Sequence, residues 1–187
     1  VIVGGLPQDK RSVVSTASYE ARIFGVHSAM PTAKAYQLCP QGIFVHGRMK
    51  RYSELSYQIM QIFADFSPDV QQMSIDEAFI DLTGTERLFG SPVDTARKIK
   101  ERVKAETGLT LSIGLAPTKY LAKLASDMKK PDGLYVIEEG SEETFMLNLP
   151  LKKVWGIGDK TYQALKAAGL RTTRKKKKKS LEALTFM

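Results

Sequence analysis

The stretch MSIDEAFIDL, residues 73–82, places three acids in a run that is otherwise apolar enough to form a buried strand. The acids are Asp76, Glu77 and Asp81. An ionised carboxylate buried alone is very costly, so each acid needs a partner, a metal ion or water. Side chains alternate between the two faces of a strand. Asp76 and Glu77 can therefore serve one site only beside a tight turn or a bulge.

Two readings of this pair are open on the stretch alone. Adjacent carboxylates repel each other unless a cation lies between them. Magnesium prefers such oxygen ligands and commonly shares them with substrate phosphates. The alternative is a hairpin tip whose acids simply point into solvent.

The surrounding pattern predicts an α+β fold. Apolar residues at helical spacing follow Ser53, an expected N-cap, and Pro68 ends that helix. A second helix is expected to begin at Ser91-Pro92 and to end at Gly108. The order of elements, α-β-β-α-β-α-β, favours a sheet with helices packed on one face. Beyond Glu138 only short helical pieces are expected, so a domain boundary is placed there. The other expected elements are an extended segment at 12–17, a helix at 31–38, strands at 70–75, 78–83, 109–116 and 133–137, and a helix at 118–129.

Composition is that of a soluble globular protein. Hydrophobic residues make up 43% of the 187 and charged residues 26%. The single cysteine excludes an internal disulfide, and no apolar run is long enough to span a bilayer. The net charge of +8 indicates an anionic partner such as nucleic acid. The block Lys175 to Lys179 supplies five of these charges, and setting it aside leaves +3.

Two basic motifs suit phosphate groups. Tyr19 and Arg22 are three residues apart, hence on one helical face, and a guanidinium beside a phenol suits phosphate oxygens. A cation–π or salt-bridge pair on a surface helix is the alternative. Lys129 and Lys130 are expected at the last turn of a helix, where the helix dipole alone would also favour them.

The segment VWGIGDK, residues 154–160, combines a Gly-x-Gly turn with the start of a helix. Backbone N–H groups at such a turn can hold phosphate. The segment predicts a helix-hairpin-helix that binds DNA backbone without reading sequence. The alternative is a Schellman-type corner between packed helices. The DNA-binding residues expected here are Gly156, Ile157, Gly158 and Lys160.

Four segments in this order resemble the Y-family, lesion-bypass DNA polymerases of the bacterial DNA polymerase IV type. They are VVSTASYEARIFGVHSAMP, SIDEAFIDL, LSIGLAPTKYLAKLASDMKKPDG and VWGIGDKT. The resemblance covers nearly the whole chain. It implies a ferredoxin-like palm at 49–137, small fingers at 1–48, and a helical thumb with the helix-hairpin-helix at 138–187.

The resemblance also implies a role for individual residues. Asp76 and Glu77 are expected to be the catalytic carboxylates that hold two magnesium ions, with Ser74 beside them. A two-metal site of this kind activates the primer 3′-hydroxyl and stabilises the leaving pyrophosphate. Asp81 lies on the Glu77 face of an ideal strand, and its role is left open. The expected ligands of the incoming dNTP are Thr16, Tyr19, Arg22 and Lys130.

The expected function is template-directed DNA synthesis on primer–template DNA during DNA repair, by a cytoplasmic bacterial monomer. The resemblance places another metal-binding aspartate and a steric gate on an earlier strand, and neither lies within these 187 residues. A C-terminal DNA-gripping domain and a sliding-clamp contact tail are likewise outside them. This segment alone is therefore expected to be inactive or nearly so.

Two rival functions remain. One is a non-catalytic module that binds DNA structure through the helix-hairpin-helix. The other is a nucleotide cyclase or another palm-like phosphoryl-transfer enzyme, which the VWGIGDKT segment disfavours.

Overall fold

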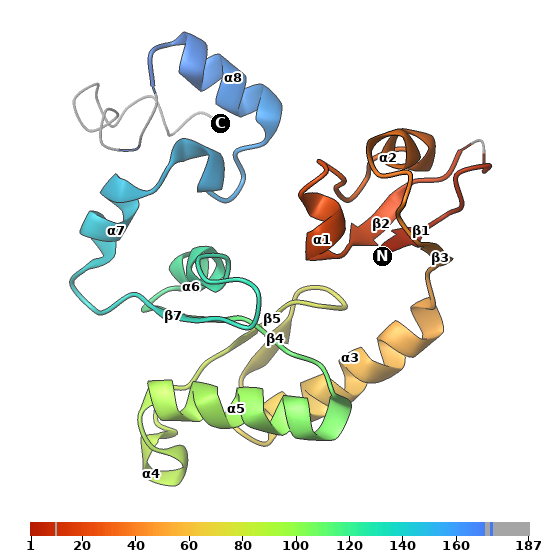
Figure 1. Ribbon diagram of the computed structural model, residues 1–187. Coiled ribbons are helices and arrows are strands. Elements are labelled where there is room, and N and C mark those ends of the chain that lie inside the picture. Colours follow the sequence, from red (N-terminus) through yellow and green to blue (C-terminus); the bar gives the residue numbers. More distant parts are fainter. Residues whose placement is uncertain (10, 171–172, 174–187) are drawn as a thin grey trace. The chain divides into compact units, whose positions relative to one another are not determined.

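The computed structural model describes residues 1–9, 11–170 and 173, which form a mixed α+β fold (Figure 1). The chain divides into a compact unit at Val1–Glu54 and a second unit that begins at Leu55. The first unit contains β1 (Ile2–Gly4), β2 (Val14–Ala17), α1 (Tyr19–Arg22), α2 (Thr32–Leu38) and β3 (Phe44–His46). The expected α+β class is confirmed.

Helix α3 (Met49–Ala64) leads into the second unit. That unit continues with β4 (Val70–Gln72), β5 (Ala78–Ile80), α4 (Glu86–Phe89), α5 (Pro92–Thr107), β6 (Ile113–Leu115), α6 (Lys119–Ser126), β7 (Leu134–Val136), α7 (Glu142–Asn148), the 3-10 turn η1 (Leu151–Lys153) and α8 (Asp159–Ala167). None of the helices in the described ranges has both the length and the apolar character that crossing a membrane requires.

The first unit is built on a three-stranded sheet in the order β2-β1-β3. Strand β1 runs antiparallel to β2 and parallel to β3. Ile2 in β1 and Val14 in β2 are almost completely buried, and α1 and α2 contribute Ala21 and Ala35 to the same core. Cys39 is also buried there as a free thiol. The short helices therefore close over one small apolar cluster.

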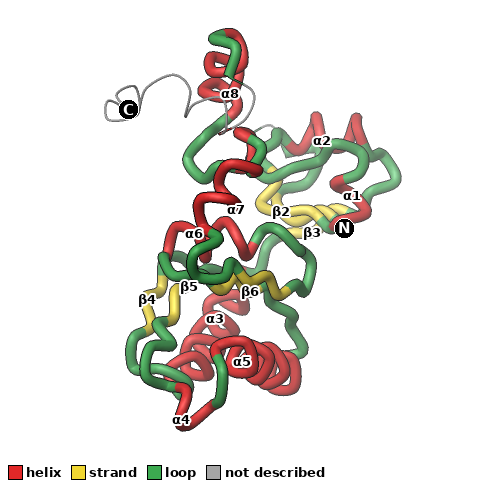
Figure 2. The backbone as a smooth tube through the Cα atoms, turned by 90° about the vertical axis from the view of Figure 1, so that its left-hand side faces the viewer, coloured by secondary structure: helices red, strands yellow, loops and turns green. Residues whose placement is uncertain are grey.

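The second unit has two pairs of strands. Strands β4 and β5 form an antiparallel hairpin, and β6 and β7 pair in parallel. Figure 2 shows α3 and α5 packed together on one side of these strands. Their contact is apolar: Ile62 and Phe63 of α3 meet Ile99 and Val103 of α5, with Ile80 of β5 against the same cluster. This core supports the strands from which the candidate site projects.

The expected order of elements in the second unit is confirmed, with the short helix α4 added after β5. Ser91 caps α5 by accepting a hydrogen bond from the Asp94 backbone N–H, and Pro92 follows at the first helical position. Gly108 ends that helix at φ +73°, a left-handed conformation in which glycine carries no steric penalty. The observed strands are shorter than expected; β6, for example, spans only Ile113–Leu115.

The expected N-cap at Ser53 is wrong. Helix α3 begins at Met49, and the Tyr52 N–H already donates to the Arg48 carbonyl at 3.0 Å. Met49, Lys50 and Arg51 form helix readily, so the helix begins one turn before the expected cap residue. The lysines at 129 and 130 are also misplaced by the sequence pattern, because α6 ends at Ser126 and both follow its end.

Helix α6 approaches β6 very closely at Gly114. A Cβ atom at Gly114 would lie 2.1 Å from the Ala122 carbonyl oxygen and 2.4 Å from the Ser126 nitrogen. Both neighbours are backbone atoms of the α6 region, so neither can move aside cheaply. Only glycine allows this contact between strand and helix.

Replacing Gly114 with alanine should therefore force α6 away from β6. We expect Gly114→Ala to lower the free energy of unfolding by about 1–3 kcal/mol, the scale of core overpacking, as measured by urea denaturation. Gly158→Ala is the matched control, because that glycine has open space around it and φ −76°. Equal stability of the two variants would contradict the close-packing argument.

Candidate active site

Asp76 and Glu77 lie in the loop that joins β4 to β5. The loop comprises residues 73–77, and it closes where the Glu77 carbonyl accepts hydrogen bonds from the N–H groups of Met73 (2.9 Å) and Ser74 (3.2 Å). Residues 71–77 are exposed rather than buried, so the expectation of a buried strand is wrong here. The strand ends before the acids because the chain turns. Alternation between faces therefore does not separate the two carboxylates.

Asp76 is held by its neighbour Ser74. The Ser74 hydroxyl donates to Asp76 Oδ1 at 2.8 Å, and the Asp76 N–H points back to the same hydroxyl at 3.4 Å. Ser74 was expected beside the site, and the structure shows its contact with Asp76. This reciprocal contact orients the carboxylate locally.

Glu77 is held by a residue that the sequence analysis missed. Lys123 on α6 forms an ion pair with Glu77 Oε1. The Lys123 side chain is 17% exposed and that of Glu77 is 44% exposed. The available signal was the spacing of Lys119 and Lys123, four residues apart on one helical face. Both lysines contact the β4–β5 hairpin, since Lys119 donates to the Gln71 side-chain oxygen.

Asp81, the third acid of the stretch, has a local structural role. Its Oδ1 accepts from the Thr83 N–H at 2.9 Å, which forms a turn just after β5. The hydrogen bonds from the Thr83 hydroxyl and backbone hold the pKa of Asp81 below its usual value, and Lys119 adds a smaller effect in the same direction. Asp81 thus has its own partner.

The pair at 76 and 77 suits a hard divalent cation. Both are carboxylates, they are adjacent and exposed, and each known contact occupies only one oxygen of its carboxylate. In the described part of the chain, no group of three or more His, Cys, Asp or Glu residues could hold a metal ion. The donors present therefore fit magnesium as a partial set of ligands.

Three of the four expected nucleotide ligands lie together in the first unit. The Arg22 guanidinium sits over the Tyr19 ring, 5.6 Å from its centroid. Arg22 Nε donates to the Ala17 carbonyl at 2.8 Å, and its Nη2 donates to the Thr16 hydroxyl at 3.3 Å. Thr16, Tyr19 and Arg22 are all exposed. The cation–π alternative describes the observed contact, and the exposed guanidinium can still reach an anion.

Lys130, the fourth expected ligand, belongs to the second unit. It pairs with Asp127 at 2.7 Å and is 44% exposed. No hydrogen bond or ion pair between described residues joins it to Asp76 or Glu77. It stays a prediction that Lys130 and the cluster around Arg22 bind one nucleotide beside the two acids.

The loop that follows Lys130 is braced from α5. Lys100 Nζ donates to the Leu111 carbonyl at 2.6 Å and the Asp132 carbonyl at 3.0 Å, and it pairs with the Asp132 carboxylate. The Lys100 side chain is only 18% exposed. One ammonium therefore ties the residues before β6 to those before β7.

The segment expected to form the helix-hairpin-helix consists of η1, a tight turn and α8. Gly156 adopts φ +91°, the Ile157 N–H donates to the Val154 carbonyl at 3.0 Å, and Gly158 precedes α8. Lys160 is exposed. The Schellman pattern occurs at the other end of α8, where the Leu170 N–H donates to the Leu165 carbonyl at 2.9 Å.

Trp155 anchors this turn to α6. Its ring lies 5.8 Å from the Tyr120 ring, and the Tyr120 hydroxyl donates to the Trp155 carbonyl at 3.3 Å. Burial raises the pKa of Tyr120. Both aromatic side chains remain partly exposed. The turn is thereby tied to the helix that carries Lys123.

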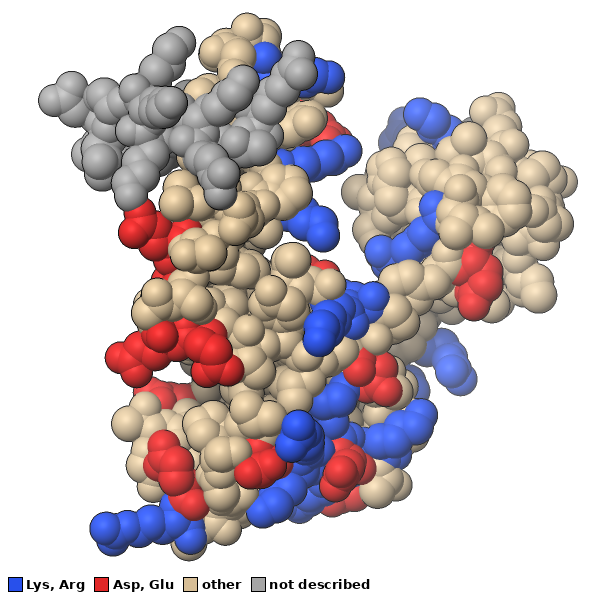
Figure 3. All heavy atoms as spheres, turned by 60° about the vertical axis from the view of Figure 1, so that its left-hand side comes forward, with Lys and Arg blue, Asp and Glu red and all other residues tan. Residues whose placement is uncertain are grey.

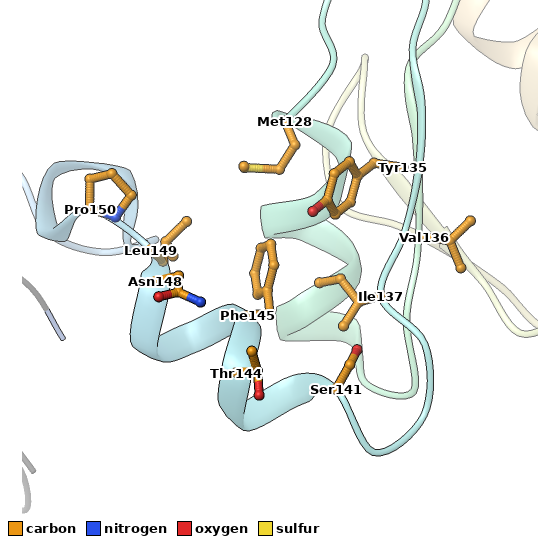
Figure 4. Close-up of a pocket in the computed structure, with 10 residues that line it drawn as sticks. All are labelled: Met128, Tyr135, Val136, Ile137, Ser141, Thr144, Phe145, Asn148, Leu149 and Pro150. Atoms are coloured by element: carbon orange, nitrogen blue, oxygen red, sulfur yellow. The ribbon is translucent and has the colours of Figure 1, made fainter. Parts of the chain in front are cut away.

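A pocket of about 330 Å³ lies between β7, α7 and the turn that follows α6 (Figure 4). The Tyr135 and Phe145 rings meet there at a centroid distance of 6.0 Å. Its lining residues are Met128, Tyr135, Val136, Ile137, Ser141, Thr144, Phe145, Asn148, Leu149 and Pro150. None of the predicted site residues is among them.

On the face shown in Figure 3, acidic and basic side chains are interspersed over the second unit.

Comparison with known proteins identifies the family. The model of the impB/mucB/samB family matches residues 1–127. The chain belongs to this family. It is 57% identical over 170 residues to DNA polymerase IV of Treponema denticola, covering 91% of this chain and 42% of the relative. It is 46% identical over 170 residues to DNA polymerase IV of Clostridium perfringens, covering 91% and 47% respectively. This chain thus spans less than half the length of these two relatives.

Solved structures of Y-family polymerases resemble the chain as well. The crystal structure of DinB from Sulfolobus solfataricus matches with a TM-score of 0.87 at 33% identity, covering 98% of this chain and 54% of that one. An insertion ternary complex of Dbh DNA polymerase matches with a TM-score of 0.86 at 33% identity and the same coverage. The Y-family resemblance seen in the sequence is confirmed.

The brace formed by Lys100 generates a stability prediction. Lys100→Met would leave two backbone carbonyls and one carboxylate without their donor. We expect a loss of about 1.5–3 kcal/mol of unfolding free energy, typical of hydrogen bonds to charged groups, in guanidinium denaturation. Arg97→Met is the control, because its ion pair with Asp94 is exposed on both sides and should change stability by less than about 1 kcal/mol. If Lys100→Met lowers the free energy of unfolding no more than Arg97→Met does, Lys100 does not stabilise these loops.

Proposed function

We propose that the complete protein is a DNA-directed DNA polymerase of the lesion-bypass type, which transfers a nucleotidyl group from a dNTP to a primer 3′-hydroxyl. The observation that carries the proposal is the exposed β4–β5 loop, in which Asp76 and Glu77 are adjacent and escape the alternation of a strand. Membership of the family and the names of the relatives support the same activity.

Asp76 and Glu77 would hold two magnesium ions. When bound, these ions activate the primer hydroxyl and stabilise the leaving pyrophosphate. Ser74 keeps the Asp76 carboxylate oriented through its hydroxyl. The loop itself is anchored by the double hydrogen bond to the Glu77 carbonyl. The chain's own contribution is thus to hold two oxygen ligands in position before substrate arrives.

The triphosphate would be bound by Thr16, Tyr19, Arg22 and Lys130. The Arg22 guanidinium is already oriented by the Ala17 carbonyl and by Thr16, so it loses little freedom when it pairs with phosphate oxygens. Lys130 offers a second cation, which would exchange Asp127 for phosphate.

Primer–template DNA would be the macromolecular partner. The turn at Gly156, Ile157 and Gly158, at the N-terminus of α8, would meet phosphates, with Lys160 beside it. The backbone donors would be N–H groups other than that of Ile157, which already donates to the Val154 carbonyl. The division into fingers at 1–48, palm at 49–137 and thumb at 138–187 belongs to this proposal. So do a monomeric state, a cytoplasmic bacterial location, and a sliding clamp as a partner of the complete protein. The lysine block at 175–179 lies outside the described residues.

Substitution of Asp76 separates a polymerase from a module that only binds DNA. In the complete protein, Asp76→Ala should lower primer extension by about 10³-fold, the scale of losing one preorganised electrostatic group, while DNA affinity stays within about twofold. Gel-shift and extension assays measure the two quantities. Glu101→Ala, an exposed acid on α5, is the control and should leave both unchanged. If Asp76→Ala abolishes both DNA binding and synthesis, or changes neither, the assignment of Asp76 is contradicted.

The 187-residue chain by itself should show little or no synthesis in the same assay with magnesium. The resemblance assigns a further metal-binding aspartate to a strand outside these residues, and a two-metal site lacking a ligand loses its geometry. Robust extension by this chain alone would contradict the expectation.

Lys160 tests the proposed interface with the DNA backbone. Lys160→Ala in the complete protein should weaken binding equally for unrelated sequences and reduce the salt dependence of binding by about one phosphate contact. Titrations at several salt concentrations measure the slope. A change confined to one DNA sequence would instead indicate base recognition.

A further inference from the structure

Lys123 is a nearly buried cation in contact with a proposed metal ligand, and none of the roles described so far uses it. Its ammonium pairs with Glu77 Oε1, and its side chain is 17% exposed. Lys123 belongs to α6, whose Leu121, Leu124 and Ala125 are buried in the neighbouring core. Packing of this helix therefore delivers the ammonium to the loop.

We propose that Lys123 is a positioning residue and an exchangeable counter-ion: it holds the Glu77 carboxylate until a divalent ion arrives, and that ion then displaces it. The inference rests on the proposed function, because it takes Glu77 as a metal ligand. It concerns how the carboxylate is kept in place when no metal is bound.

The argument is electrostatic. A divalent ion bound to Glu77 would lie within a few ångströms of the Lys123 ammonium, and like charges at that distance repel. The two cations therefore compete for one carboxylate. Asp76 does not face this competition, because its described partner is the neutral Ser74 hydroxyl.

The phosphates of a nucleotide change the balance. Once displaced from Glu77, an ammonium on a flexible four-carbon stem needs a new anion, and triphosphate oxygens are suitable partners. Lys123 thus disfavours the metal ion alone and favours the metal ion that arrives with a nucleotide. The charges at the site therefore favour binding of the metal ion together with the nucleotide.

Binding of Mn²⁺ to the complete protein, monitored by electron paramagnetic resonance of the free ion, tests the competition without any need for activity. Lys123→Met removes the charge and keeps most of the stem. It should tighten Mn²⁺ binding by about 10-fold, the scale of repulsion between a unit charge and a divalent ion roughly 5 Å apart in water. Lys123→Arg should give no gain. Lys119→Met, the same charge change one turn earlier on α6, should give a smaller gain.

A double variant shows whether the gain acts through Glu77. Combining Lys123→Met with Glu77→Gln should abolish the gain. A gain that persists in the double variant, or no gain in Lys123→Met with its thermal melting intact, would overturn the proposal. Should Lys123→Met fail to fold, Lys123→Gln takes its place under the same criteria.

The proposed function has its own criterion in this experiment. Glu77→Gln alone should weaken Mn²⁺ binding, and if it has no effect, the assignment of Glu77 as a metal ligand fails, independently of Lys123. Repeating the titrations with dATP present tests joint entry. The gain from Lys123→Met should then fall below about twofold, whereas an undiminished gain would contradict the exchange onto phosphate.

Discussion

The geometry of the candidate site depends on a double hydrogen bond to one carbonyl oxygen. The Glu77 carbonyl accepts from the backbone N–H groups of Met73 and Ser74, and this closes the loop between β4 and β5. The chain bends at residues 74–76, so the alternation that sends neighbouring side chains of a strand to opposite faces does not apply to Asp76. Both carboxylates therefore lie on an exposed turn.

The surrounding elements maintain this arrangement from both sides. Gly114 lets α6 approach β6 closely enough for the helix to carry Lys123 to the loop. Beneath the strands, α3 and α5 supply the apolar core on which the hairpin rests. Lys100 then ties the segment after Lys130 to the start of β6. A side chain far from the acids in sequence can thus influence them through rigid packing.

Much of the second unit was predictable from local signals. Ser91 followed by Pro92, and Gly108 at the far end, determined both limits of α5, because capping and proline geometry depend on neighbouring residues alone. Ser53 misled for the same reason: a good cap residue does not start a helix when good helix formers precede it. The order of elements followed from hydrophobic periodicity, which survives errors at the boundaries.

The candidate site was predictable in its residues but not in its contacts. The run at 73–82 indicated important acids, yet the sequence suggested burial where residues 73–77 are exposed. The ion pair between Lys123 and Glu77 spans 46 positions, and no local pattern encodes which face of α6 meets the hairpin. Asp81 likewise looked similar to its neighbours, and only its hydrogen bond to Thr83 distinguishes it.

Trp155 is the only tryptophan in the chain, and it stands in the turn before α8 beside Tyr120. Its indole is 47% exposed. Intrinsic emission excited at the red edge of protein absorbance therefore comes from a single known position. A change in its intensity or wavelength reports an event at this turn, so the protein carries a built-in optical probe that needs no label.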